Sequence, residues 1–380
     1  MIYLDNSATT NKKPNSVVLA MLDGITKYSA NPGRSGHALS LEVAEKIMQT
    51  RQNIADFFGC PSVENVIFTS GCTEALNLAI LGYAKPGGHV IATVFDHNST
   101  LRPLFYLKEQ GIIELDVISP KNSEKITLND IKNSVKSNTY MIVNTHISNV
   151  DGAETDIDQI GEFCHQNNIL YLVDAAQSAG HKQIDMQKSH INLLAIAGHK
   201  GLFALQGVGA LLINSQTLPK PIKFGGTGTD SISVIQPTEP PECFESGTIA
   251  TPNILSLNEG INFCRKNLEK IQNKIELLTN YLLKELSCIE GLKIYTSKNN
   301  PNGVIAFNIS NIDSSDISSY LNEKYKIFVR SGLHCAPLKH KFLGTENQGI
   351  IRVSLSYFNT KNELNTLIRA LKTYINNLNI

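Results

Sequence analysis

The segment VRSGLHCAPLKHKFLGT near the C-terminus contains one cysteine, Cys335, which follows His334 directly and precedes His340 by five residues. A thiol in this setting can bind a metal, undergo redox chemistry, act as a nucleophile, or be buried in an ordinary loop. Adjacent side chains seldom converge on one ion, and the sequence has no spaced second pair of ligands. We therefore expect no metal site and interpret His340 as an ordinary loop residue.

Two reactive residues follow buried apolar runs farther up the chain. Asp174 ends such a run within VDAAQS, and Gln177 follows three residues later. A carboxylate at the end of an apolar strand is expensive to bury unless it is paired, which favours a functional role. Lys200 follows another run after a Gly-His turn. Desolvation would lower the pKa of its amine and suit it to Schiff-base formation; a snorkelling surface lysine is the plainer alternative.

Other strand ends carry further polar residues. In TSGCTEALN, a Gly turn precedes a helix start, where backbone N–H groups and the Thr73 hydroxyl could hold an anion. An ordinary helix cap, with Glu74 favouring the helix dipole, is the commoner reading of such a segment taken alone. The segment FDHNS places His97 at the sheet edge, and THISNVDG offers His146 and Asn149.

Together these strand ends provide an anion site, a histidine, a buried carboxylate, a glutamine and a lysine. Pyridoxal phosphate needs such a set, because it requires an anion site, a lysine for the imine, and an aspartate that keeps the pyridine nitrogen protonated as an electron sink. The set therefore predicts a site for this cofactor.

The elements that must position these residues are strands that alternate with helices. Continuous apolar runs predict strands buried on both faces, over residues 64–70, 89–95, 114–119, 140–146, 169–175, 191–197 and 207–213. Helical stretches at 73–84 and 156–168 lie between some of them. Repeated strand–helix–strand units indicate a mainly parallel sheet with helices on both sides, and ligands of such sheets bind beyond the carboxyl ends of the strands.

The remaining segments predict a second, smaller domain. Residues 40–59 have the spacing of an amphipathic helix capped by Ser40 and ended by Gly59, and 219–253 is a long loop rich in Pro, Gly, Ser and Thr. A long helix over about 254–288 leads into a second α/β unit. We expect a large domain over 15–264, and a small domain formed by 1–14 and 265–380.

Composition narrows the class of protein. The 380 residues are 42% hydrophobic, and Lys+Arg and Asp+Glu are both 34, so the usual electrostatic reason to expect nucleic acid or an anionic membrane is absent. No signal-peptide pattern or membrane-spanning run is found. The seven cysteines are scattered without a CxxC pair, which favours free thiols in a reducing cytoplasm.

The sequence resembles the cysteine desulfurases, pyridoxal-phosphate enzymes of the class V aminotransferase group. The resemblance covers essentially the whole chain, and its motifs occur in order: NPGRSGH, SGCTEALN, DAAQS, GHKGL, GVGALLI, FESGTIATPN, RSGLHCAPL and IRVSLSYFNT. It implies the pyridoxal-phosphate-dependent transferase fold of type I. That fold has a mainly parallel seven-stranded sheet flanked by helices and a smaller C-terminal α/β domain, here carrying the cysteine loop.

Positions that match the family motifs imply roles around the cofactor ring. By this resemblance Lys200 bonds covalently to the cofactor, Asp174 pairs with the pyridine nitrogen, and Gln177 bonds the phenolic oxygen. His97 stacks on the ring and can assist proton transfer. Arg352 and Asn149 clamp the carboxylate of the substrate, for which the bidentate fork of arginine is suited.

Matching positions also imply a phosphate site and a sulfur acceptor. The backbone around Cys72, together with Thr73 and His199, holds the phosphate, and Thr248 joins them from the partner subunit of a homodimer. His37 matches a motif position near the active site. Cys335 matches the cysteine that accepts sulfur, and its short loop resembles the family branch with a tethered, less mobile cysteine.

Two positions depart from the family pattern. Where many relatives carry Ser or Thr before Gly-His-Lys, this chain has Ala197. The chain therefore lacks one side-chain hydroxyl that could bind the phosphate. The Gly-Pro that precedes the QGVG-like turn in relatives is here Ala204-Leu205. These departures bear on cofactor affinity and on loop geometry.

The resemblance implies a cysteine desulfurase, which converts L-cysteine to L-alanine and leaves a persulfide on Cys335 that passes to a sulfur-acceptor protein. His334, Arg330 and the charge of the pocket are expected to favour the thiolate. The alternatives are a selenocysteine lyase or another pyridoxal-phosphate reaction of this group on a small amino acid, and a binding protein without activity. Iron–sulfur cluster assembly, thio-modified RNA or another fate of the sulfur stay open.

Overall fold

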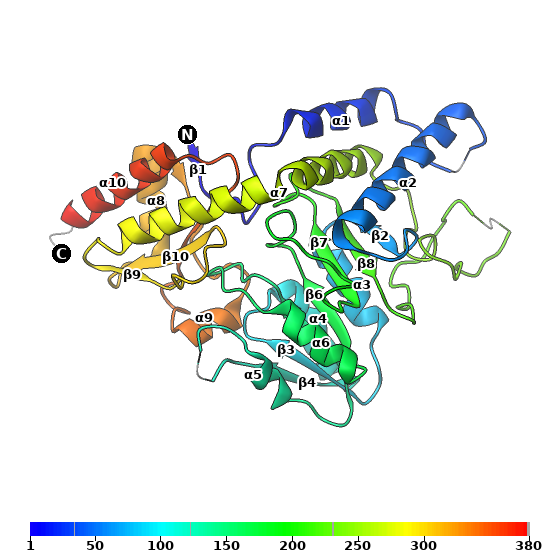
Figure 1. The fold of residues 1–380 in the computed structure, drawn as a ribbon, viewed down its shortest axis with the longest axis horizontal. Helices are drawn as coiled ribbons and strands as arrows, with labels where there is room; N and C mark the ends of the chain where they lie inside the picture. The colour runs from blue at the N-terminus through cyan, green and yellow to red at the C-terminus, as the bar shows by residue number, and fades with distance from the viewer. Residues whose placement is uncertain (34, 122, 230–231, 378–380) are drawn as a thin grey trace.

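The computed structural model describes residues 1–33, 35–121, 123–229 and 232–377. Arg34 of the NPGRSGH motif, and Asp230 and Ser231 of the long loop, lie outside the described residues. Within these ranges the chain folds into a large part built on one sheet and a smaller part at the other end of a long helix (Figure 1).

A seven-stranded sheet forms the centre of the large part. In spatial order its strands are β2 (Val66–Thr69), β8 (Gly209–Ile213), β7 (Leu193–Ala197), β6 (Leu170–Asp174), β5 (Thr139–Thr145), β3 (Gly88–Thr93) and β4 (Ile113–Ile118). The strands from β7 to β4 pair in parallel, and β8 is antiparallel to both of its neighbours. The mainly parallel seven-stranded sheet expected from the apolar runs is confirmed.

Helices cover both faces of this sheet because alternate strand residues point to opposite sides. On one face, Tyr171 and Val173 pack in a core with α2 (Ala38–Phe58), α6 (Ile157–Gln166) and α7 (Thr251–Leu286). On the other face, Leu172 packs in a second core with α3 (Cys72–Gly82) and α4 (Asn98–Glu109). The short α5 (Leu128–Lys132) adds to the first core, and α1 (Asn15–Thr26) packs on α7.

The smaller part has its own sheet, in which β10 (Val304–Ile309) lies between β12 (Ile351–Ser354) and β9 (Leu292–Ile294) in antiparallel pairing. Its helices are α8 (Ser314–Tyr325), α9 (Pro337–Leu343) and α10 (Lys361–Asn377). The N-terminal β1 (Ile2–Tyr3) pairs in parallel with β11 (Ile327–Phe328), so the first residues belong with the C-terminal elements.

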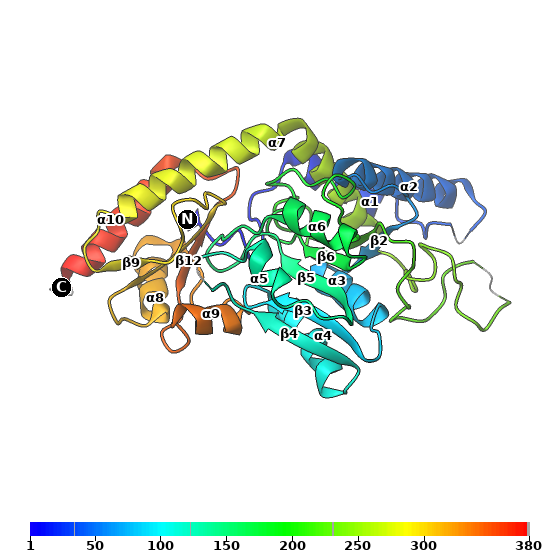
Figure 2. The same cartoon turned by 60° about the horizontal axis from the view of Figure 1, so that its bottom comes forward.

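Helix α7 connects the two parts and is seen along its length in Figure 2. Its residues up to Ile275 belong to a core of the large sheet, whereas residues from Leu278 onward belong to the core of the small sheet. The helix is continuous through residue 265, and the domain division at 264/265 stays a prediction. No helix among the described residues combines the length and apolarity that a bilayer crossing requires.

The start of α2 differs from the sequence prediction. The cap is His37, whose Nδ1 accepts a hydrogen bond from the Ser40 backbone N–H at 3.2 Å, so the prediction of Ser40 as cap is wrong. An imidazole nitrogen supplies the acceptor that the first turn needs, as a hydroxyl would. Ser40 is buried and donates its hydroxyl to the Asn31 carbonyl instead. Gly59 ends the helix in the left-handed conformation, as predicted.

Candidate active site

A cavity of about 230 Å³ lies at the carboxyl ends of the parallel strands. Its lining includes eight residues expected from the sequence, namely Cys72, Thr73, His97, Asn149, Asp174, Gln177, His199 and Lys200. These residues come from the ends of β2, β3, β5, β6 and β7 or from the helix starts that follow them. A parallel sheet brings such ends together at one edge, which is why residues far apart in sequence share one cavity.

Lys200 follows β7 and faces this cavity. Burial lowers the pKa of its amine, with further lowering by the cations Arg352 and Arg330, while the Asp174 carboxylate acts in the opposite direction. Because of this lowered pKa, a larger fraction of the amine is neutral and nucleophilic at pH 7 than in an exposed lysine.

Asp174 is the last residue of β6 and is almost completely buried. Its Oδ1 accepts hydrogen bonds from the Ala176 backbone N–H at 2.9 Å and from the Cys72 thiol at 3.4 Å. Burial raises the pKa of Cys72, so this residue stays a thiol and donates. Gln177 is held by a hydrogen bond from its amide to the Ser7 carbonyl at 3.1 Å. The carboxylate and the amide are therefore fixed in orientation at the cavity wall.

The turn before α3 approaches the sheet closely because a glycine lies beneath it. A Cβ on Gly209 of β8 would lie 2.5 Å from the Ile196 carbonyl oxygen and 2.8 Å from the backbone of Gly71. Glu74 fixes the same turn, accepting from the Ser70 N–H at 2.6 Å and from Lys223 at 3.2 Å. The N-terminal N–H groups of α3 are thereby aimed at the cavity, as an anion site requires.

His199 supplies an independent sign that a ligand belongs here. Its Nδ1 is buried and makes no hydrogen bond within the part of the chain that the structure describes. Burial lowers the pKa of its imidazole to about 4, so the ring is neutral at pH 7. A buried polar atom without a partner is uncommon, and this one belongs to a residue that lines the cavity. The residues present therefore fit a phosphate-bearing cofactor.

His97 caps α4, and its partner Ser99 was not predicted from the sequence. His97 Nδ1 accepts from the Ser99 backbone N–H at 3.0 Å and lies 2.9 Å from the Ser99 hydroxyl. Burial lowers the pKa of His97 to about 4. The Ser99 hydroxyl is also 2.8 Å from Thr73 Oγ1, and both line the cavity. The segment FDHNS contained this serine, but only the fold shows that it meets Thr73.

The Cys335 loop is docked on the large part beside His97. The Asn98 N–H donates to the Cys335 carbonyl at 2.8 Å, and the Asn149 amide donates to the His334 carbonyl at 2.8 Å. His334 and Cys335 both adopt left-handed φ values of 50° and 55°, an unfavourable conformation that persists only where the surroundings hold it. The Cys335 side chain is exposed, and Arg330 Nη2 lies 3.9 Å from its sulfur.

Two expectations about the neighbouring histidines are wrong. His340 is a buried residue of α9, whose Nδ1 meets Thr345 Oγ1 at 2.9 Å and whose Nε2 lies 3.4 Å from His334 Nδ1. It is therefore not an ordinary loop residue. Burial lowers the pKa of His334 to about 2, so this ring is neutral and faces His340. Arg330, rather than His334, is the cation beside Cys335. The described residues contain no cluster of three or more His, Cys, Asp or Glu that could hold a metal.

Besides Cys335, three expected site residues lie outside the cavity lining. Arg352 of β12 is buried, bonded through Nη2 to Asp5 at 2.7 Å and through Nη1 to the Asn149 carbonyl at 3.0 Å. Its role as a carboxylate clamp stays a prediction. His37 is exposed at the start of α2. Thr248 lines a neighbouring cavity of about 160 Å³, and its predicted role concerns a partner subunit.

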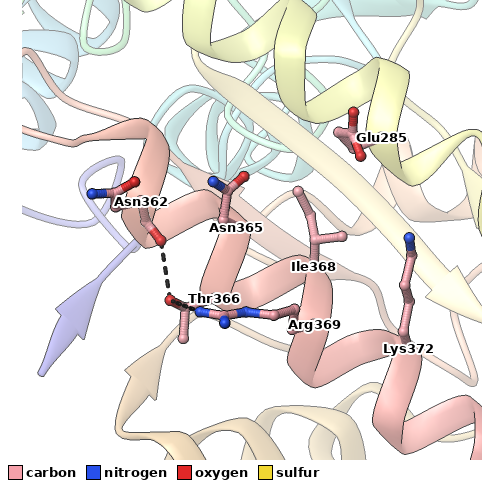
Figure 3. Close-up of a pocket in the computed structure, with 7 residues that line it drawn as sticks. All are labelled: Glu285, Asn362, Asn365, Thr366, Ile368, Arg369 and Lys372. Carbon is pink, nitrogen blue, oxygen red and sulfur yellow. Dashed lines mark hydrogen bonds between the residues drawn. The ribbon is translucent and has the colours of Figure 1, made fainter.

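A larger groove of about 670 Å³ lies elsewhere, between α7 and α10 (Figure 3). Polar side chains line most of it, including Glu285, Arg369 and Lys372, and Thr366 donates to the Asn362 carbonyl at 3.0 Å. None of the residues expected to act in the reaction lines this groove. The strand-end cavity is therefore the candidate active site, although it is smaller.

Comparisons with known proteins identify the family of the chain. The Aminotransferase class-V family model matches residues 2–367, and the chain belongs to this family, which depends on pyridoxal phosphate. A probable cysteine desulfurase of Methanothermobacter thermautotrophicus is 32% identical over 381 residues, covering 98% of this chain and 94% of that protein. A probable cysteine desulfurase of Pyrococcus abyssi is 31% identical and covers 100% and 95%.

A solved structure gives the same result. The apo cysteine desulfurase of Thermococcus onnurineus NA1 has a TM-score of 0.92 and 31% identity, covering 99% of this chain and 95% of that one. A cysteine desulfurase of Escherichia coli, at 23% identity and a TM-score of 0.89, shares the fold. Within the class V family, the chain is thus similar over its full length to cysteine desulfurases.

Proposed function

We propose that this protein is a cysteine desulfurase that removes sulfur from L-cysteine, giving L-alanine and a persulfide on Cys335. The full-length similarity to probable cysteine desulfurases supports the reaction class. The observation that carries the proposal is the position of Cys335, whose loop is bonded to Asn98 and Asn149 at the edge of the cavity that contains Lys200 and Asp174. A thiol so placed can receive sulfur from a molecule in the cavity.

The cavity residues fit pyridoxal phosphate, which when bound supplies the electron sink that allows the substrate C–S bond to break. We propose that Lys200 attaches the cofactor, Asp174 pairs with its ring nitrogen, and Gln177 bonds its phenolic oxygen. The N-terminus of α3, Thr73 and His199 would hold the phosphate, and the unpartnered Nδ1 of His199 supports this.

Lys200 and His97 are the groups that would move protons. The lowered pKa of Lys200 suits its Nζ to take the proton from the substrate Cα and then to donate it to another atom of the bound molecule. His97 is neutral at pH 7, and its Nδ1 accepts hydrogen bonds, so Nε2 carries the ring proton. A neutral His97 can therefore donate a hydrogen bond through Nε2 without adding a positive charge to the site.

The sulfur transfer step would use Cys335 as nucleophile. Its thiolate attacks the substrate sulfur, a new S–S bond forms, and the C–S bond electrons stay with the carbon fragment that is released as alanine after protonation. Arg330, 3.9 Å from the Cys335 sulfur, offers a positive charge to the thiolate. We propose Asn149 and Arg352 as the substrate carboxylate site, which requires Arg352 to exchange a present contact for the ligand.

A homodimer would complete the phosphate site through Thr248. The same long loop carries apolar side chains that are almost fully exposed in the single chain, with Ile232 at 98%, Val234 at 101% and Ile235 at 77%. Such a group of exposed apolar residues is typical of a surface covered by another protein. We propose that a second copy covers it, and that His37 approaches the active site only in that assembly.

The sulfur would pass from the exposed Cys335 to an acceptor protein. All seven cysteines are free thiols in the structure, and disulfides persist mainly in oxidising compartments. We therefore propose the cytoplasm as the location. Iron–sulfur cluster assembly is one of the uses of the sulfur that this reaction would supply.

The test is an assay of alanine and sulfide from L-cysteine, with and without reductant, in the intact protein and in Cys335→Ala. We expect Cys335→Ala to lose persulfide formation and at least about a hundredfold in alanine release. Cys288→Ala, which removes another exposed thiol, is the matched control and should be unchanged. Full persulfide formation and sulfur transfer by Cys335→Ala would refute the assignment. Alanine release from selenocysteine, measured side by side, separates the lyase alternative.

A further inference from the structure

Ser99 lies between two groups of the proposed cofactor site, and the proposed function gives it no role. Its hydroxyl oxygen is 2.8 Å from Thr73 Oγ1 and 2.9 Å from His97 Nδ1. All three residues line the strand-end cavity, at the starts of α3 and α4. A continuous chain of hydrogen bonds therefore connects the expected phosphate end of the cavity to the histidine.

The direction of the hydrogens in this chain follows from one fixed donor. The Ser99 backbone N–H donates to His97 Nδ1 at 3.0 Å, so that nitrogen carries no hydrogen in the neutral ring. The Ser99 hydroxyl must then give its single hydrogen to Nδ1, because Nδ1 has none to give. Thr73 must in turn donate to Ser99 Oγ. The hydrogens thus run from Thr73 through Ser99 to His97.

An anion beside Thr73 would reverse part of this order. Thr73 has one hydroxyl hydrogen, and a phosphoryl oxygen is a stronger acceptor than a neutral hydroxyl. When Thr73 donates to the anion, its Oγ1 is left only as an acceptor, so the Thr73–Ser99 hydrogen bond is kept when Ser99 donates to Thr73 Oγ1. His97 Nδ1 then keeps the backbone N–H alone. Since a donor to the neutral form of a base opposes its protonation, loss of that donor makes Nδ1 more basic.

We propose that Ser99 is a positioning residue that couples occupancy of the phosphoryl site at Thr73 to the proton affinity of His97 Nδ1. The inference rests on the proposed function, because the cofactor phosphate is the natural occupant of that site. The coupling is reciprocal. A protonated Nδ1 would donate to Ser99 Oγ, which sets the same hydrogen order as the anion does.

Other charges also act on His97 and must be separated from this relay. Asp174 favours its protonation, and Lys200, Arg330 and Arg352 oppose it. A phosphoryl group would add a direct electrostatic attraction of its own. Replacement of Ser99 by Ala leaves all these charges in place and removes only the hydroxyl, so the difference between the two proteins isolates the relay.

The experiment uses the cofactor-free full chain with ¹⁵N-labelled histidine rings and inorganic phosphate as the probe. The His97 signals are assigned by their absence in His97→Gln. In the intact protein, phosphate should move the Nδ1 resonance at neutral pH toward the value of a less hydrogen-bonded nitrogen, and should raise the pKa of His97. This rise should exceed that in Ser99→Ala by about half a pH unit to one pH unit. Ser99→Thr keeps the hydroxyl and should behave as the intact protein.

Two results would overturn the proposal in distinguishable ways. An equal response to phosphate in the intact protein and in Ser99→Ala would refute the relay and leave the anion site standing. Failure of phosphate to bind at Thr73 in the intact protein would refute the anion site, and the proposed cofactor use with it. If Ser99→Ala does not fold, Thr73→Val also breaks the chain of hydrogen bonds while retaining the shape of the side chain. Because Thr73 itself is expected to contact the anion, this comparison is made at phosphate concentrations that saturate both proteins.

Discussion

The strand-end cavity and the Cys335 loop are built in contrasting ways, although they belong to one proposed reaction. Asp174 ends β6 and Lys200 follows β7, and both strands are buried on both faces, so the two residues are positioned by two hydrophobic cores. Cys335 lies on a loop of the small part, exposed, in a left-handed conformation, and bonded to the large part through Asn98 and Asn149.

This difference follows from what each region must do in the proposed reaction. Groups that must face one cofactor in one geometry are placed on rigid elements, where a misplacement of about 1 Å is costly. A thiol that takes sulfur from the cavity and gives it to another protein must be reachable from both sides. The loop is held to the large part by hydrogen bonds to the carbonyls of His334 and Cys335, which leave the thiol exposed.

The largest expected effect comes from the rigid region. Lys200→Ala should reduce alanine release by at least about a thousandfold, because no other amine lines the cavity among the described residues. The purified variant should also lack the yellow absorbance of a bound cofactor. Lys188→Ala, at an exposed position, is the control. A Lys200→Ala protein that keeps more than a tenth of the activity would remove the central residue of the proposal.

The next effect concerns the attachment of the small part. Lys339 of α9 forms a buried ion pair with Asp151 at 2.7 Å, and its ammonium also lies over the Phe95 ring. Lys339→Met leaves the Asp151 carboxylate buried without its partner, which should lower the free energy of unfolding by about 3–5 kcal/mol in chemical denaturation. Persulfide formation on Cys335 should fall more than cofactor binding.

The matched variants for this pair separate charge from packing. Lys341→Met, on the exposed side of the same helix, should have little effect. The double variant Asp151→Leu/Lys339→Met should recover much of the lost stability, because no unpaired charge is left. A double variant as unstable as the single one would show that packing, and not the ion pair, holds α9 to the large part.

The sequence predicts the strand-end cavity better than it predicts the Cys335 loop. The apolar runs predicted all seven strands of the sheet, and the polar residues at their ends, such as Asp174 and Lys200, meet in one cavity as expected. This succeeds because a run buried on both faces has one interpretation in an alternating α/β chain, and parallel topology then dictates where the ends lie.

Residues whose environment depends on contacts between distant segments could not be predicted. The sequence predicts a loop residue at His340 because the burial of this residue depends on how α9 docks. Burial also removes the charge expected on His334. Ser99 meets Thr73 only when α3 and α4 start side by side. The cap of α2 was missed because a histidine rather than Ser40 supplies the acceptor. None of these pairings leaves a periodic pattern in the sequence.

A third effect tests whether the cavity is complete in a single chain. Val234→Asp places a charge on the exposed apolar part of the long loop. If a second copy covers that surface, the dimer dissociation constant should rise by about tenfold or more in sedimentation, and cofactor retention should fall with it because Thr248 is lost. Leu277→Asp, at an exposed leucine of α7, is the control. A monomeric intact protein that binds the cofactor fully would contradict the shared site.

The smallest expected effect tests the phosphate end of the cavity. Ala197 ends β7 and lines the cavity, at a position where the family pattern implies a hydroxyl. Ala197→Ser should tighten pyridoxal phosphate binding by about fivefold, the value of one added hydrogen bond near 1 kcal/mol.

Two comparisons make this small effect interpretable. Ala176→Ser adds a hydroxyl to the same cavity beside Asp174 and should not tighten binding. Pyridoxal without its phosphate should bind Ala197→Ser and the intact protein equally, because the added hydroxyl would have no anion to meet. Equal tightening of pyridoxal and of pyridoxal phosphate would place the Ala197 side chain at the ring instead, and the phosphate end of the cavity would then have to be reassigned.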